Sequence, residues 1–185
     1  MHLLTAPTVE PVTLDEAKLA ARISGTTAFD ALVPALIVAA RQLAEQQTGR
    51  QLMAQTWRTE QTDWPAADQV LHVHQATAAA VSYWNGSAWV TMAGGTFVAF
   101  GLGNGTALAP ALTTSWPTLG DIAGGPRVRI DLTAGAADAA DVPECVKLYI
   151  KALVAHWVDN PSAAAAGNTA EAPFLGLLLD PARLY

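Results

Sequence analysis

The sequence predicts an α+β fold in which helices at both ends of the chain bracket an inserted antiparallel β region. Apolar residues recur at helical spacing before about residue 52 and again after residue 143. The stretch from Leu52 to Thr133 is instead rich in Thr, Val, Trp and Gly, with short alternating runs between turns. The 185 residues are 51% hydrophobic and 14% charged, so we expect a buried core that needs neither metal nor disulfide.

The first predicted helix follows Thr13 and runs to about Ile23. Thr13 and Glu16 have the spacing of a capping box, in which each side chain accepts a hydrogen bond from the backbone of the other residue. Acidic residues in the first turn also favour the positive end of the helix dipole.

A second helix is predicted from Ala31 to Gln47, with Asp30 as its N-cap. Pro34 falls in its first turn, where the missing N–H costs least. Gly49 is expected to end the helix in a left-handed conformation. The apolar residues of this helix extend beyond one face, which suits a subunit that packs against neighbours.

Short strands are predicted through the middle of the chain. Asn85 and Gly86 indicate a hairpin turn, and the Gly-rich and Ala-rich stretch 101–112 is expected to be a loop. The candidate strands are Gln55–Gln61, Val70–Val73, Val81–Tyr83, Trp89–Thr91, Thr96–Phe100 and Val128–Leu132.

A helical pattern returns at Pro143 and stops at Asn160 and Pro161. Residues 162–172 are predicted to form a small-residue linker, which is followed by an apolar patch at 174–179. We therefore divide a single structural domain into an N-terminal helical part (1–52), a β-rich insertion (53–134) and a C-terminal helix with a terminal arm (135–185).

The charge pattern offers no means of binding phosphates tightly. The net charge is −6, and the ten Lys and Arg residues are scattered along the chain. The first residues lack the features of a signal peptide, and no run of about 18 apolar residues predicts a membrane span. We expect a protein of the cytosol that lets DNA pass without sequence-specific binding.

The motif search favours a protein without catalytic, cofactor or metal sites. The sequence has no Walker loop, nucleophile elbow, zincin motif or Cys pair, and Cys145 is the single cysteine. His72 and His74 could share one face of a strand, yet no third ligand follows by spacing. A hydrolase with carboxylate or histidine chemistry stays open only as a remote alternative.

Tryptophans suggest another class of function. Five of the six, Trp57, Trp64, Trp84, Trp89 and Trp116, fall in the β region. Exposed tryptophans stack on sugars, which would make the chain a carbohydrate- or surface-binding β module. The favoured interpretation is that they fill a small β core or an oligomer interface.

Read in order, a series of short segments resembles the head-tail connector (adaptor) family of tailed bacteriophages. The likeness covers nearly the whole chain, and its specificity lies in the order and spacing of the segments. They are 10–18, 39–45, 48–50, 55–57, 142–143, 156–157, Pro173 and 178–183. The departures are Pro34 and the stretch 101–112.

This resemblance implies an α-helical connector core of about four helices with a β insertion. It also implies a structural, non-enzymatic subunit of a homo-oligomeric ring, usually a dodecamer, in the neck of the virion. The ring's partners would be the portal protein and a downstream head-completion or tail-terminator protein, and the ring would continue the DNA channel.

We expect two helices, 31–47 and 142–160, to build the ring, and 174–185 to act as a docking arm. An acidic lumen would repel DNA. The candidate residues for contacts with other subunits or with the portal are Leu36, Ala40, Arg41, Leu43, Glu45, Arg50, Trp157, Phe174, Leu175, Leu178, Leu179, Arg183 and Tyr185.

Overall fold

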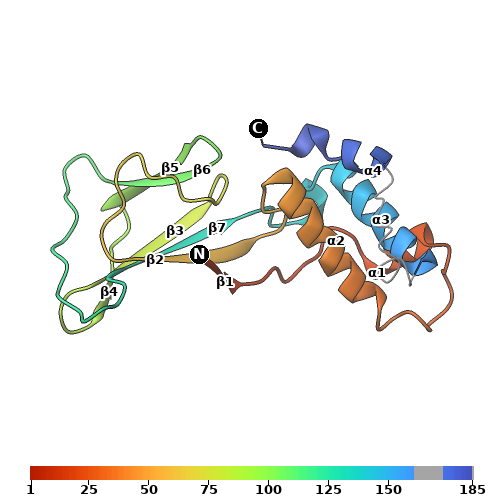
Figure 1. Cartoon of the computed structure of the whole chain (residues 1–185), viewed down its shortest axis with the longest axis horizontal. Coiled ribbons are helices and arrows are strands. Elements are labelled where there is room, and N and C mark those ends of the chain that lie inside the picture. Colours follow the sequence, from red (N-terminus) through yellow and green to blue (C-terminus); the bar gives the residue numbers. More distant parts are fainter. Residues whose placement is uncertain (161–172, 185) are drawn as a thin grey trace. The chain divides into compact units, whose positions relative to one another are not determined.

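The computed structural model describes residues 1–160 and 173–184, and Figure 1 shows their arrangement in sequence colours. The chain separates into two compact units. The β unit comprises Met1–Pro7 and Ala54–Gly135, and the helical unit comprises Thr8–Met53 and the described residues from Ala136 onward. Four helices and antiparallel sheets confirm the α+β class. The predicted linker 162–172 lies outside the described residues.

The helical unit contains α1 (Leu14–Ala20), α2 (Val33–Thr48), α3 (Glu144–Asp159) and the short α4 (Pro173–Leu177). Single 3-10 turns at Ala139–Asp141 and Asp180–Ala182 complete it. Helix α3 packs on α1, α2 and α4. The core between these helices combines small side chains such as Ala17 and Ala40, which let the helices pack closely, with the large side chain of Tyr149.

The start of α1 agrees with its prediction, but its end does not. The Thr13 hydroxyl accepts a hydrogen bond from the Glu16 backbone N–H, and the Glu16 carboxylate accepts one from the Thr13 backbone N–H. The helix stops at Ala20 rather than near Ile23, because Ala21 caps it and Arg22 takes a positive φ of 58°. A residue in that region cannot continue a right-handed helix.

Asp30 does not cap α2. Its carboxylate instead accepts a hydrogen bond from the Lys18 ammonium group at 2.6 Å, and α2 begins only at Val33 without a side-chain cap. Pro34 does lie in the first turn, and Gly49 ends the helix with φ 72°, as predicted. Later in the chain, α3 starts directly after Pro143 and ends before Asn160, also as predicted.

The β unit contains a five-stranded antiparallel sheet in the order β1-β2-β7-β3-β4 and a separate β5-β6 hairpin. The strands are β1 (His2–Thr5), β2 (Gln55–Gln61), β3 (Ala78–Trp84), β4 (Trp89–Thr91), β5 (Phe97–Leu102), β6 (Gly105–Pro110) and β7 (Val128–Ala134). Strands β3 and β4 form the predicted hairpin around Asn85 and Gly86.

Three features of the β unit differ from the prediction. Residues 1–7, assigned by sequence to the helical part, instead supply strand β1. The stretch 101–112 is not a loop, since it holds the turn of the β5-β6 hairpin and the whole of β6. Val70–Val73 forms no strand and contributes only a bridge between Leu71 and Thr106.

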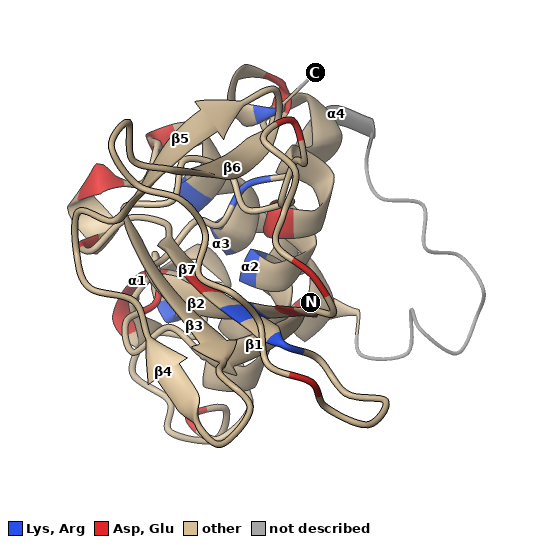
Figure 2. Cartoon of the chain, turned by 90° about the vertical axis from the view of Figure 1, so that its left-hand side faces the viewer, with Lys and Arg blue, Asp and Glu red and all other residues tan. Residues whose placement is uncertain are grey.

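The central strand pair shows why this sheet is stable. Val128, Ile130, Leu132 and Ala134 of β7 alternate as buried residues, while the residues between them face partners on β2. Arg58 faces Asp131 and donates two hydrogen bonds of 2.7 Å to its carboxylate. Arg129 likewise donates to Glu60 at 2.8 Å. Figure 2 shows charged residues of both signs among these strands, and directly opposed pairs stabilise a sheet.

Candidate assembly surfaces

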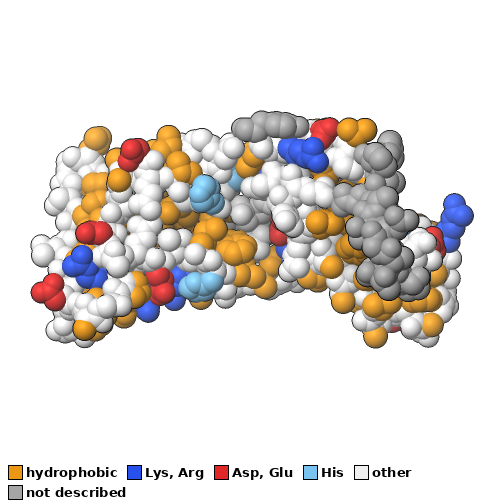
Figure 3. All heavy atoms as spheres, in the orientation of Figure 1, with side chains coloured by type: hydrophobic (Ala, Val, Ile, Leu, Met, Phe, Trp, Pro, Cys, Tyr) orange, Lys and Arg blue, Asp and Glu red, His pale blue; other side chains and the backbone are white. Residues whose placement is uncertain are grey.

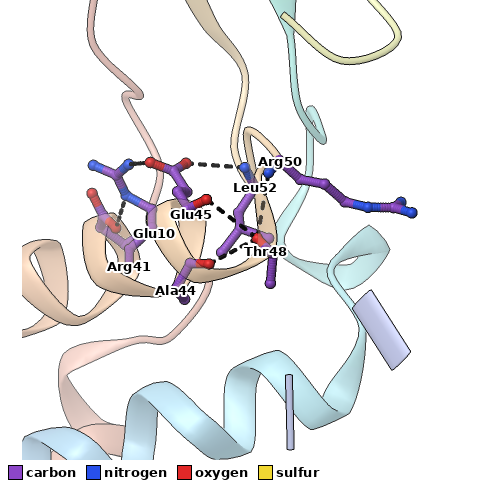
Figure 4. Close-up of polar contacts among 7 residues, drawn as sticks. All are labelled: Glu10, Arg41, Ala44, Glu45, Thr48, Arg50 and Leu52. Carbon is purple, nitrogen blue, oxygen red and sulfur yellow. Dashed lines mark hydrogen bonds and ion pairs between the residues drawn. The ribbon is translucent and has the colours of Figure 1, made fainter. Parts of the chain in front are cut away.

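Arg41 and Glu45 of α2 together join two other segments of the helical unit to this helix (Figure 4). The Arg41 side chain is only 4% exposed. Nε donates to Glu10 at 2.8 Å, and a terminal nitrogen donates to Glu45 at 2.8 Å. The other Glu45 oxygen accepts the backbone N–H of Leu52 at 3.0 Å. A buried cation needs its carboxylate partners, because removing one of them leaves an uncompensated charge away from water. The charged groups of Arg41 and Glu45 are therefore paired within the chain itself.

The end of α2 is tied to the C-terminal segment. The Thr48 hydroxyl donates to the Ala44 carbonyl at 2.7 Å and accepts the Arg50 N–H at 3.4 Å. The Thr48 carbonyl accepts the N–H of Leu184 at 2.9 Å. Gly49 follows Thr48 in the left-handed conformation that ends α2. The Arg50 side chain extends away from this group in Figure 4.

Several other candidate contact residues pack inside the helical unit. Ala40 is fully buried, and Leu36, Leu43 and Trp157 are half-buried against the same core. Their apolar character is explained by packing between α2 and α3. The surplus apolar surface expected on α2 is therefore smaller than its composition suggests.

The C-terminal segment packs on the helical core of its own chain. Leu179 is fully buried and Ala182 nearly so, while Leu175 and Leu178 pack against the same cluster. Arg183 pairs with Asp180 at 2.7 Å. Tyr185 and the side chain of Phe174 lie outside the described residues. The described part of the predicted docking arm thus packs on the core of its own chain through Leu179 and Ala182.

Two features that sequence reasoning did not single out lie at the surface of the helical unit. The first is Leu148 on the outer face of α3, which is 51% exposed. It could have been found from the helical period, since Leu148 lies opposite the buried stripe of Val146, Tyr149 and Ile150.

The second feature is a pocket of about 330 Å³ between the start of α2 and the segment before α1. Hydrophobic side chains gather at the surface over this part of α2 and the loop preceding it (Figure 3). Spacing along the chain could not have predicted it, because two segments meet there. The apolar residues that line it are Val9, Val12, Leu14, Pro34, Ile37 and Val38.

Hydrogen bonds from Thr13, and then two nearby lysines, favour the ionised form of Glu16. Hydrogen bonds from the backbone and hydroxyl of Thr13 lower the pKa of Glu16, and Lys151 and Lys147 of α3 lower it further. A hydrogen bond from Lys147, at 2.7 Å, similarly lowers the pKa of Glu144. The α1 cap is therefore anionic at neutral pH.

The tryptophans of the β unit make contacts within the protein. Trp64 and Trp116 stack at 4.6 Å, and the Trp64 indole donates to the Pro117 carbonyl at 2.8 Å. The Arg129 guanidinium lies 3.8 Å above the ring of Trp89. Ring faces that are taken by protein groups favour a structural role over stacking on sugars.

No metal site or membrane span is evident in the described part of the chain. There, no group of three or more His, Cys, Asp or Glu residues could hold a metal ion, so His72 and His74 gain no third ligand. No described helix is long and apolar enough to cross a membrane.

Comparisons with known proteins give one consistent result. No protein-family model and no curated protein matches the sequence. A chain from the neck of an empty gene transfer agent particle, computed with C6 symmetry, has a TM-score of 0.75 and 22% identity. One from the virion of the native particle has 0.72 and 21%, and one from its neck, computed with C12 symmetry, has 0.66 and 20%. In each case the match covers 100% of this chain and 96% of the other.

These matches extend over both units, so the β insertion belongs to the shared fold. They bear out the resemblance to head-tail connectors at the level of the fold. The chain has the fold of a protein found in the neck of a gene transfer agent particle.

Proposed function

We propose that the chain is a structural head-tail connector subunit of a tailed phage, prophage or related particle. Copies of it would form a closed ring between the portal and the next head-completion or tail protein, in the neck of the virion. The observation that carries the proposal is the full-length similarity to chains of neck structures computed with C6 and C12 symmetry.

The mechanism is geometric. Identical subunits joined by one repeated, head-to-tail contact close around an axis and leave a central hole. A net charge of −6 suits a conduit for DNA, because like charges prevent binding by counterion release. The Arg58–Asp131 and Arg129–Glu60 pairs add to this, since their guanidinium groups are already held by carboxylates.

The test is electron microscopy of the purified protein alone and after mixing with the portal protein of the same particle. We expect rings, coaxial with the portal in the mixture. A protein that stays monomeric with and without the portal would refute the proposal. The same sample in a glycan-binding screen tests the carbohydrate-binding alternative, which requires saturable sugar binding by the monomer.

A further inference from the structure

The turn between β3 and β4 contains an Asn-Gly pair in an arrangement that favours a reaction between the two residues. The side-chain carbonyl of Asn85 accepts hydrogen bonds from the backbone N–H groups of Ser87 and Ala88, each at 2.9 Å. Bonds to residues two and three positions onward fold the Asn85 side chain over its own peptide bond to Gly86. Cγ of Asn85 is thereby held toward the Gly86 nitrogen, which is the atom that can attack it.

Both atoms of such an attack are prepared by their surroundings. The two N–H donors polarise the Asn85 carbonyl and stabilise the negative charge that develops on Oδ1, as the donors of an oxyanion hole do. Gly86 is exposed, and within the described residues its N–H donates no hydrogen bond. Glycine has no side chain to hinder the approach, and Gly86 already takes a positive φ of 103° in this turn.

A second Asn-Gly pair, Asn104 and Gly105, has the same sequence but a different environment. Gly105 is buried and belongs to β6, where it faces Leu102 as the pair that closes the β5-β6 hairpin. A side-chain carbon on Gly105 would collide with the carbonyl oxygen of Leu71. The nitrogen of Gly105 is therefore fixed in a buried strand rather than in an exposed turn. The two pairs allow the effect of structure to be separated from that of sequence within one chain.

We propose that Asn85 is a site of spontaneous deamidation in the folded protein. The Gly86 nitrogen loses its proton to the solvent and attacks Cγ of Asn85, the bond from Cγ to Nδ2 breaks, and ammonia leaves with a proton from the solvent. Water then opens the cyclic imide at one of its two carbonyls. One opening yields aspartate and the other yields isoaspartate. The inference concerns the β unit alone and does not depend on the proposed ring.

The reaction would change both the charge and the backbone of this part of the β unit. Residues 75–120 contain no Asp, Glu, Lys, Arg or His, so the new carboxylate would be the first charge among them. Isoaspartate also adds one carbon to the backbone between Asn85 and Gly86. Gly120 packs so closely on this peptide that a side chain on it would collide there, and its N–H donates to the Trp84 carbonyl at 2.8 Å. The longer backbone would loosen this contact.

Peptide mapping of the full chain measures the reaction at both asparagines. Folded protein and protein unfolded in urea are incubated at mildly alkaline pH, and their chymotryptic peptides are analysed by mass spectrometry. Chymotrypsin is suitable because aromatic residues separate the two sites, whereas the nearest tryptic sites are Arg58 and Arg127. In the folded protein we expect conversion at Asn85 to be at least about tenfold faster than at Asn104, and in urea we expect similar rates. Equal rates in the folded protein, or a faster rate at Asn104, would overturn the proposal.

Asn85→Gln is the matched variant for the chemical step. It keeps a carboxamide at this exposed position, but the Gly86 nitrogen would have to close a larger and less favourable ring. We expect the mass shift and the isoaspartate product at position 85 to disappear, while conversion at Asn104 stays unchanged. Conversion at position 85 that is as fast in Asn85→Gln as in the wild type would exclude attack by the Gly86 nitrogen.

Discussion

Truncation of Leu179 tests whether the C-terminal segment is part of the core. The side chain is fully buried in the helical cluster, so Leu179→Ala removes its apolar contacts and leaves a cavity. Such changes cost about 2–5 kcal/mol. Against a total stability of roughly 5–15 kcal/mol this loss is large. For a chain of this size it corresponds to a fall in Tm of about 4–20 °C.

The assay is thermal and urea unfolding followed by the helical circular dichroism signal. The matched control is Leu177→Ala, two residues earlier and 62% exposed, which should change stability by less than about 0.5 kcal/mol. Equal, small effects of the two substitutions would mean that the segment is not packed on its own chain. The reasoning about the C-terminal core would then be wrong, and a free docking arm would be the better description.

Three further predictions concern other parts of the chain. Arg41→Ala should lower the free energy of unfolding, measured in urea, by about 3–5 kcal/mol, because it leaves two carboxylates without their shared cation. A loss below about 1 kcal/mol would contradict the description of Arg41 as a buried cation that Glu10 and Glu45 hold. Thr13→Ala should cost about 1 kcal/mol at neutral pH. Because the pKa of Glu16 is lowered in the folded state, its stabilisation is present above its unfolded pKa and lost as pH falls through the folded value. The difference between Thr13→Ala and wild type should therefore shrink in acid, and a difference independent of pH would exclude a contribution from the hydrogen bond that the Thr13 hydroxyl donates to the Glu16 carboxylate. Trp64→Ala should cost at least about 1 kcal/mol through loss of its stack on Trp116, whereas an unchanged unfolding midpoint would indicate that Trp64 is a free surface residue.

Local signals predicted the elements whose boundaries depend on local chemistry. The Thr13–Glu16 box, Pro34, Gly49 and Pro143 each act within one turn of the chain, and each lies where the sequence placed it. The role of Asp30 was misassigned because an aspartate carboxylate can serve either as an N-cap or as an ion-pair partner. Only the fold brings Lys18 close enough to decide between the two roles.

Elements that depend on distant partners were the ones missed. Strand β1 is short and exposed along its length, so it lacks the alternation that marks a half-buried strand, and it exists through pairing with β2. Strand β6 lies in an Ala- and Gly-containing stretch whose composition favours a loop. Its pairing with β5 and its bridge to Leu71 compensate for that weak propensity.

Three of the segments that carry the family resemblance have structural explanations inside one chain. Glu10 and the helix segment with Arg41 and Glu45 form the buried ion group, and Thr48–Gly49–Arg50 ends α2 against the C-terminal segment. Such residues are constrained by the fold whatever the neighbouring subunit presents. A contact between copies must instead use side chains that the fold leaves exposed. For the proposed ring, subunit contacts are therefore to be sought among exposed side chains, where a substitution can change assembly without first unfolding the subunit.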